Sequence, residues 1–198
     1  MKNRYGIDIW SDDNFFIEDG VVKVNYKPYP SLIKIVKDVR KQGFKGPLLL
    51  RFPHITKKQV KTLFNTFNAS IKEYDYKGKF NAVFPLKVNQ LPNFIHPLVA
   101  AGKKYNYGLE AGSKAELVIA MTYNNMGSPI TINGFKDKEM IHLCFIAKSM
   151  GHDITVIIEG LNELEMILEV LKETKMEAPN VGLRVRLHSG GSGVWAKS

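Results

Sequence analysis

The sequence has few of the features that mark secreted or membrane proteins. A single cysteine, Cys144, stands among 198 residues, which excludes an internal disulfide framework and favours a reducing compartment. No uninterrupted apolar run approaches the length needed to span a bilayer. No apolar segment long enough for a signal peptide follows the amino terminus. We therefore expect a cytoplasmic protein with no membrane partner.

The motifs of several enzyme classes are also missing. No cluster of cysteine and histidine has the spacing of zinc ligands, so we expect no metal site from the residues themselves. No Gly-x-Ser-x-Gly elbow lies between a strand and a helix. The turn VNQLP at 88–92 lacks the glycines of a dinucleotide fingerprint. The glycine-rich HSGGSG at 188–193 could hold a phosphate, but without Walker spacing a flexible loop is the simpler interpretation.

Positive charge is in excess, with 28 lysines and arginines against 19 acidic residues and a formal net charge of +9. A basic balance can indicate nucleic-acid binding. Here, however, the lysines are spread through helical stretches and are not gathered with interleaved aromatic residues. Solvated helix faces explain them better, so we expect no nucleic-acid partner.

The chain contains 44% hydrophobic and 24% charged residues, which suits a globular protein of one or two domains. Turn and periodicity signals predict a hairpin over 5–25 with Ile7 and Ile9 in its first strand, and a helix capped by Ser31. They then predict a short buried strand at 47–53 and a helix from Thr56. The predicted domains are 1–46, a β-hairpin and helix, and 47–198.

From residue 80 onward, strands and helices alternate at intervals of about 25 residues. The predicted strands are 80–88, 105–110, 130–133, 154–159 and 181–187, and the predicted helices are 93–101, 113–122, 137–150 and 162–174. This rhythm is typical of βα units with a parallel sheet. Both an open doubly wound sheet and part of an eight-stranded barrel fit it. Because Ser198 follows a strand and loop with no covering helix, we expect the chain to be cut short.

Lys87 lies near the carboxyl end of the buried strand predicted at 80–88. Strand alternation puts Lys87 on the opposite face from Leu86. A lysine in such a place is poorly solvated, which makes the neutral amine accessible, and neutral amines form Schiff bases with aldehydes. The alternative is a lysine whose stem covers apolar surface while its ammonium group reaches water. From this stretch alone, the alternative is the stronger interpretation.

Polar residues recur where the later predicted strands end, and in parallel sheets these ends meet at one edge. Each acidic or hydroxyl residue there is more simply explained as a helix cap. Their repetition around one edge favours a site for an anionic, aromatic cofactor. The candidates are Lys87, Asn89, Glu110, Ser113, Asn133, Gly134, Glu159, Gly160, Arg184, Arg186 and His188.

Several segments at these positions resemble biosynthetic arginine decarboxylases. The resemblance runs through most of the chain, and the leading segments are specific to the arginine branch; relatives acting on ornithine or diaminopimelate differ there. The segments are YGIDIWS at 5–11, LLRFP at 49–53, FPLKVNQ at 84–90, GLEAGSKAEL at 108–117, NGFKD at 133–137, LRVRL at 183–187 and SGVW at 192–195.

This resemblance implies an α/β fold: a partial (β/α)8 TIM-like barrel of the alanine-racemase kind, preceded by an N-terminal β-hairpin segment that belongs to a β domain. It implies that Lys87 carries pyridoxal 5'-phosphate as an internal aldimine and that Glu110 and Arg184 contact this cofactor. The implied reaction converts L-arginine to agmatine and CO2, for polyamine biosynthesis. Magnesium and a homo-oligomer, dimer or tetramer, are implied for the full-length protein.

Family members continue well past the position of Ser198, so we expect residues 1–198 alone to be inactive. Two alternatives stay open at this point. One is a decarboxylase for another basic amino acid, such as ornithine, lysine or diaminopimelate. The other is a non-catalytic module that binds pyridoxal phosphate or nucleic acid.

Overall fold

A computed structural model describes residues 6–185 of the protein. The chain divides into two compact units, Met1–Lys58 and Gln59–Ser198. A small antiparallel sheet lies in the first unit, and a larger parallel sheet lies in the second. The parallel sheet holds the strand ends on which the predicted site depends.

In the first unit, the predicted hairpin is confirmed as β1 (Phe15–Glu18) paired with β2 (Val21–Val24). Asp19 and Gly20 connect the strands with φ values of 51° and 74°, the positive values that a tight hairpin turn requires. Helix α2 (Leu32–Lys41) follows, and Ser31 caps it as predicted because its side chain accepts a hydrogen bond from the Lys34 N–H.

Two predictions for this part of the chain are wrong. Residues 7–10 form a helical turn, α1 (Ile7–Trp10). Ile7 is buried there while Ile9 is 86% exposed, so the two isoleucines do not share a buried strand face. The strand predicted at 47–53 is absent, because residues 47–52 form neither strand nor helix and Pro53 begins a helix; Leu49 is 74% exposed. Helix α3 (Pro53–Glu73) begins at a proline, whose missing N–H is not needed in a first helical turn.

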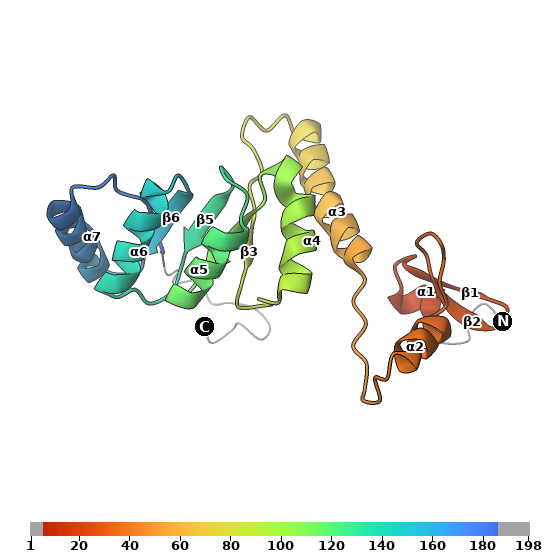
Figure 1. Cartoon of the computed structure of the whole chain (residues 1–198). Coiled ribbons are helices and arrows are strands. Elements are labelled where there is room, and N and C mark those ends of the chain that lie inside the picture. Colours follow the sequence, from red (N-terminus) through yellow and green to blue (C-terminus); the bar gives the residue numbers. More distant parts are fainter. Residues whose placement is uncertain (1–5, 186–198) are drawn as a thin grey trace. The chain divides into compact units, whose positions relative to one another are not determined.

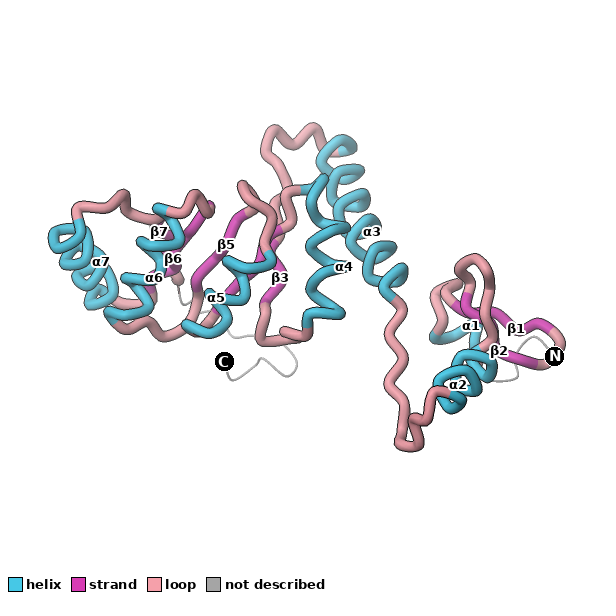
Figure 2. The backbone as a smooth tube through the Cα atoms, viewed as in Figure 1, coloured by secondary structure: helices cyan, strands magenta, loops and turns pink. Residues whose placement is uncertain are grey.

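The second unit is built from alternating strands and helices, as predicted (Figures 1 and 2). Its parallel sheet has the order β3-β4-β5-β6-β7, which is also the order along the chain. The strands are β3 (Val83–Pro85), β4 (Gly108–Ala111), β5 (Pro129–Ile132), β6 (Asp153–Ile158) and β7 (Asn180–Leu183). The helices between them are α4 (Pro92–Gly102), α5 (Lys114–Tyr123), α6 (Lys138–Ser149) and α7 (Leu161–Thr174).

The strand order decides between the two architectures that the sequence left open. An open doubly wound sheet reverses its strand order at a switch point. No reversal occurs among the five parallel strands described, and each helix from α4 to α7 packs against the next one. These features confirm a partial barrel of the (β/α)8 kind.

The core of this unit lies between the sheet and its helices. Alternate residues of β5 and β6, among them Ile132 and Val156, are fully buried. Phe145 and Cys144 of α6 are also fully buried, and burial raises the pKa of the Cys144 thiol to about 12. Cys144 is therefore a packing residue of the core.

Strand β3 is shorter than the predicted strand 80–88. The Leu86 N–H still donates to the Glu110 carbonyl at 2.9 Å, and Leu86 is fully buried. The chain then turns, because the Val88 N–H donates back to the Pro85 carbonyl, and Val88 is 66% exposed. The predicted alternation therefore ends at Leu86, and Lys87 belongs to the turn.

The start of β4 also differs from the prediction. Residues 103–105 form a short 3-10 helix, and Asn106 has a φ of 57°. Tyr105 stacks on Phe64 of α3 with ring centroids 4.5 Å apart. The strand predicted from Tyr105 therefore begins only at Gly108, because the preceding residues turn and pack against α3.

The contrast between Leu86 and Val88 gives a stability prediction. Leu86→Ala should lower the free energy of unfolding by about 2–5 kcal/mol, because it leaves a cavity in a closed core. Val88→Ala, two residues away and exposed, should change it by less than about 0.5 kcal/mol. Urea titration followed by circular dichroism measures both, and equal losses would contradict the observed burial.

Candidate active site

The structure places most of the predicted site residues at the carboxyl edge of the parallel sheet. Lys87 follows β3, Glu110 lies in β4, Asn133 follows β5, Glu159 follows β6 and Arg184 follows β7. Because the strands are parallel, their carboxyl ends share one edge. Within residues 6–185, the hydrogen bonds and charges at this edge form two groups.

The first group contains Lys87 and Glu110. The Lys87 side chain is exposed, so the prediction that it is poorly solvated is wrong for the described part of the chain. Burial raises the pKa of Glu110 above its ordinary value, while the nearby Lys87 charge opposes that shift and the Glu116 carboxylate adds to it. An amine and a carboxyl group thus lie at the ends of neighbouring strands, and their charges influence each other.

Ser113 and Glu116 organise the start of α5 beside this group. The Ser113 Oγ accepts a hydrogen bond from the Glu116 N–H, so the simpler interpretation of Ser113 as a helix cap is confirmed. Glu116 Oε2 accepts from the Gly112 N–H at 2.7 Å, and its Oε1 accepts from Gln90 Nε2 at 2.9 Å. Glu116 therefore connects the segments that follow β3 and β4. The sequence analysis missed this role, although the Ser-x-x-Glu spacing signals it.

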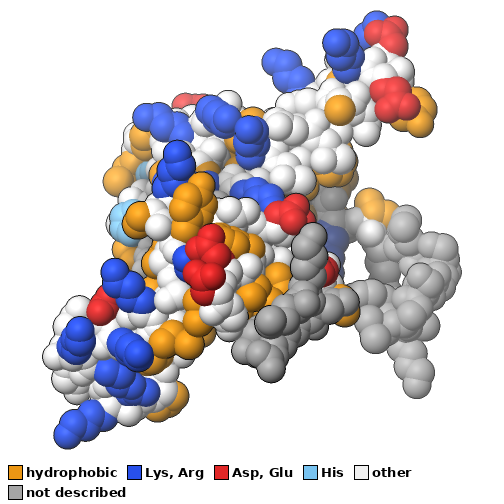
Figure 3. Space-filling model, turned by 90° about the vertical axis from the view of Figure 1, so that its right-hand side faces the viewer, with side chains coloured by type: hydrophobic (Ala, Val, Ile, Leu, Met, Phe, Trp, Pro, Cys, Tyr) orange, Lys and Arg blue, Asp and Glu red, His pale blue; other side chains and the backbone are white. Residues whose placement is uncertain are grey.

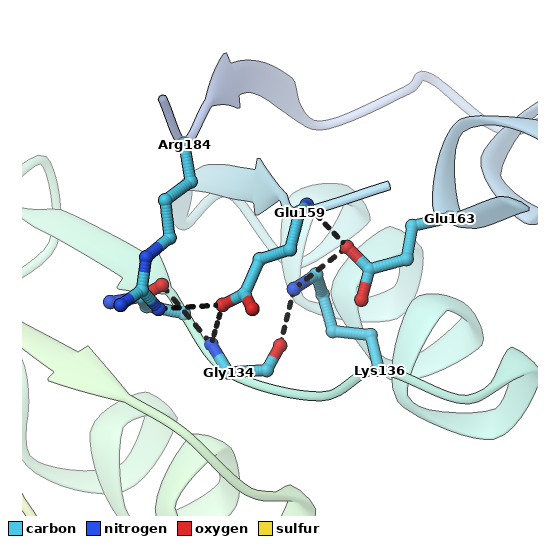
Figure 4. A network of polar contacts seen from close by, with 6 residues as sticks. Gly134, Lys136, Glu159, Glu163 and Arg184 are labelled. Carbon is cyan, nitrogen blue, oxygen red and sulfur yellow. Dashed lines mark hydrogen bonds and ion pairs between the residues drawn. The ribbon is translucent and has the colours of Figure 1, made fainter. Parts of the chain in front are cut away.

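The second group contains Gly134, Glu159 and Arg184 (Figure 4). Glu159 Oε1 accepts hydrogen bonds from Arg184 Nη1 at 3.0 Å and from the Gly134 N–H at 3.2 Å. The bond from Arg184 is the main reason why the pKa of Glu159 lies below its ordinary value. Gly134 has a φ of 99°, a conformation that favours glycine. A carboxylate and a guanidinium group are therefore paired at the edge.

Beneath this group lies a buried ion pair that the sequence analysis did not identify. Lys136 is 1% exposed, and its Nζ lies 3.1 Å from Glu163 Oε2 while also donating to the Gly134 carbonyl. Glu163 Oε2 accepts from the Glu159 N–H at 2.8 Å. Figure 4 shows the Lys136 and Glu163 side chains converging beside Glu159. In the sequence, a glutamate in the first turn of the predicted helix at 162–174 is the feature that indicates a structural role for Glu163.

The remaining candidates have local roles or lie elsewhere. Asn89 Oδ1 accepts from the Leu91 N–H, which closes a turn. Gly160 is the N-cap residue of α7 and contributes no side chain. Arg186, His188 and the glycine-rich segment at 188–193 lie outside the described residues.

The structure also bears on metals, membranes and charge. In the part of the chain that it describes, no group of three or more His, Cys, Asp or Glu side chains could hold a metal ion. No helix among those same residues is long and apolar enough to cross a membrane. Lys and Arg side chains are scattered over the face in Figure 3, among acidic and hydrophobic ones. Within residues 6–185, several lysines are paired with acidic residues, as Lys114 is with Asp137 and Glu139.

The sequence is similar to those of known enzymes over nearly its whole length. No protein-family model matches the chain. A biosynthetic arginine decarboxylase of Prochlorococcus marinus (strain MIT 9515) is 36% identical over 99% of this chain and 31% of its own length. A protein of the same name from Citrifermentans bemidjiense is 41% identical over 98% of this chain and 31% of its own length. The chain thus spans about a third of these relatives.

Two solved structures of decarboxylases are also similar to this chain. The crystal structure of the biosynthetic arginine decarboxylase of Campylobacter jejuni matches 93% of this chain and 31% of that one, with 60% identity and a TM-score of 0.90. A diaminopimelate decarboxylase from M. jannaschi matches 87% of this chain and 36% of that one, with 24% identity and a TM-score of 0.63. The second likeness concerns the fold alone.

The buried pair predicts a large stability difference between single and double variants. Lys136→Met should lower the free energy of unfolding by about 3–5 kcal/mol, because it leaves the Glu163 carboxylate buried without its cation. The double variant Lys136→Met/Glu163→Leu should be close to neutral or more stable, because it removes both charges. Urea titration checks this, and a double variant as unstable as the single one would contradict it.

The two edge carboxyl groups predict opposite pH trends. The pKa of Glu159 is lowered in the folded state, so its stabilising effect is present above the ordinary value of 4.5 and is lost as the pH falls through the folded value. Glu159→Gln should therefore reduce stability most at neutral pH.

The pKa of Glu110 is raised, so its ionisation destabilises the fold as the pH rises. The stability of Glu110→Gln, compared with that of the unaltered protein, should therefore increase between about pH 4 and 7. Thermal unfolding across this range measures both trends, and parallel trends would refute the assignment.

Proposed function

We propose that this chain is the amino-terminal part of a biosynthetic arginine decarboxylase that uses pyridoxal 5'-phosphate. One observation carries the proposal: Lys87 follows the strand that pairs with the strand of Glu110 at the carboxyl edge of a partial barrel, in a chain 60% identical to a solved arginine decarboxylase. Among the curated relatives, proteins of the same name are 36% and 41% identical over nearly the whole chain. The activity belongs to the intact protein, of which these relatives suggest the chain is about a third.

The edge residues fit part of a site for this cofactor. The Lys87 amine is exposed and can reach an aldehyde carbon, the group that amines bind covalently. Glu110 keeps its carboxyl proton to a higher pH than an ordinary glutamate, because it is partly buried. Arg184 adds a permanent positive charge suited to an anionic ligand, and Glu159 holds it in place. We assign Lys87, Glu110 and Arg184 to cofactor binding and Lys87 to catalysis.

When bound, pyridoxal phosphate supplies the electron sink that accepts the bonding electrons as CO2 leaves the substrate. The substrate we propose is L-arginine, and the products are agmatine and CO2, which lead to spermidine and other polyamines. The protein's task is to bind and orient the reactants and to exclude water. The Lys136–Glu163 pair contributes to that task by ordering the segments at the edge.

Further properties of the intact protein belong to the same proposal. We propose a cytoplasmic homo-oligomer, dimer or tetramer, on the strength of the family resemblance. The division into a β-hairpin segment at 1–46 and a barrel from residue 47 also stays a prediction. The resemblance implies magnesium as well, but residues 6–185 do not provide a fitting cluster of ligands, so no step here depends on a metal.

The assignment of Lys87 predicts a specific covalent label. Borohydride treatment of the intact protein loaded with pyridoxal phosphate, followed by peptide mapping, should place the label on Lys87. Lys87→Met should abolish both the label and agmatine production from arginine. Lys172→Met, an exposed lysine on α7, is the matched control and should retain both.

The outcomes separate the candidate functions. A label on another lysine would refute the assignment of Lys87. A product from ornithine, lysine or diaminopimelate, without agmatine from arginine, would indicate a decarboxylase of another branch. No label at all, together with salt-dependent binding of nucleic acid, would favour a non-catalytic module.

A further inference from the structure

Lys136 is buried at the edge of the sheet, but it is not among the residues assigned above to cofactor binding or catalysis. Among the residues that the structure describes, it is one of the largest side chains that are fully buried, and the charged one among them. Burying a charge costs several kcal/mol of desolvation, and hydrophobic residues of similar volume often serve the fold equally well. Stability alone is therefore a weak explanation for this lysine.

The contacts of Lys136 connect three segments at the carboxyl edge of the sheet. Its ammonium group bonds the Gly134 carbonyl after β5 and the Glu163 carboxylate at the start of α7. Glu163 accepts a hydrogen bond from the backbone N–H of Glu159 after β6. Glu159 then accepts from the Gly134 N–H and from Arg184 after β7. The backbone of Glu159 is thus bonded to Glu163 and its side chain to Gly134, and Lys136 binds both Glu163 and Gly134.

Arg184 is the exposed end of this network. Its side chain is 60% exposed, so little packing restrains it. Within residues 6–185, the guanidinium group is oriented by its hydrogen bond to Glu159. The position of Arg184 therefore depends on where Glu159 lies, and Glu159 depends on the buried pair below it.

We propose that Lys136 is a positioning residue which, through Glu163 and Glu159, holds the Arg184 guanidinium group in place to bind the anionic cofactor. The inference rests on the proposed function, because it takes pyridoxal phosphate as the ligand of Arg184. Lys136 itself is buried and does not touch the cofactor. Its effect on cofactor affinity must pass through Arg184.

A mutant cycle on the intact protein tests this dependence. The dissociation constant of pyridoxal phosphate is measured by absorbance titration of the cofactor-free protein. Lys136→Met/Glu163→Leu, which removes both buried charges, should weaken binding by about tenfold, the effect expected when a supporting hydrogen-bond partner is lost. Added to Arg184→Met, the same double change should weaken binding by no more than about twofold further, because the group it positions is already gone.

A matched control separates this effect from the loss of any ion pair. Lys138→Met/Glu173→Leu removes an exposed pair between α6 and α7, whose charged atoms lie 2.6 Å apart. This control should leave the affinity for the cofactor unchanged. A polar replacement, Lys136→Gln/Glu163→Gln, goes through the same titrations in case the apolar replacement does not fold.

The outcomes distinguish this inference from the proposed function. Unchanged affinity, or equal losses with and without Arg184, would overturn the inference alone. Failure of both replacements to fold would assign Lys136 to stability and would also overturn it. No binding of pyridoxal phosphate by the unaltered intact protein would overturn the proposed function and this inference with it.

Discussion

Parallel pairing of the strands in chain order is the constraint on which the rest of the second unit depends. Each strand must be reached by a crossover, so every strand of this sheet ends at the same edge. The polypeptide therefore gathers residues from distant parts of the sequence, such as Lys87 and Arg184, without needing contacts between their own segments. The same constraint places the N-termini of α5, α6 and α7 at that edge, where unpaired backbone N–H groups need acceptors.

Carboxylates near the start of these helices meet that need in a repeated way. In α5 and α7 the third helical residue is a glutamate, and each accepts from the N–H of the residue just before the N-cap. In α6 the N-cap Asp137 accepts from the Met140 N–H instead. Glu163 differs from Glu116 in being buried, and of these two glutamates it is the one that pairs with a buried lysine. The capping groups thus lie at the same edge of the sheet as the candidate site and belong to the two groups of polar contacts there.

Patterns of neighbouring residues were enough to predict the elements that depend on contacts within a short stretch of the chain. The caps at Ser31 and Ser113, the hairpin turn and the repeated βα units all follow from residues within a few positions of each other. Ile7 and Leu49 were predicted wrongly because a strand requires a partner, and the sequence does not reveal which segment supplies it. The strand pattern drew attention to Lys87, and the resemblance to a family then outweighed the interpretation of Lys87 as a solvated lysine. Nothing local marked Lys136, because its partner Glu163 lies beyond the next strand.

The two lysines at this edge show why solvation must be judged from the folded chain. Lys87 was expected to be poorly solvated because it closes a buried stretch, yet the turn after Pro85 exposes it. Lys136 lies in the kind of loop where a lysine usually points to water, yet its ammonium group is enclosed with a carboxylate and a carbonyl oxygen. A buried lysine becomes a neutral nucleophile only where no anion compensates its charge. Because Glu163 compensates Lys136, that lysine is suited to fixing structure. The exposed Lys87, which follows the strand beside that of Glu110, is the lysine to which the proposed function assigns covalent chemistry.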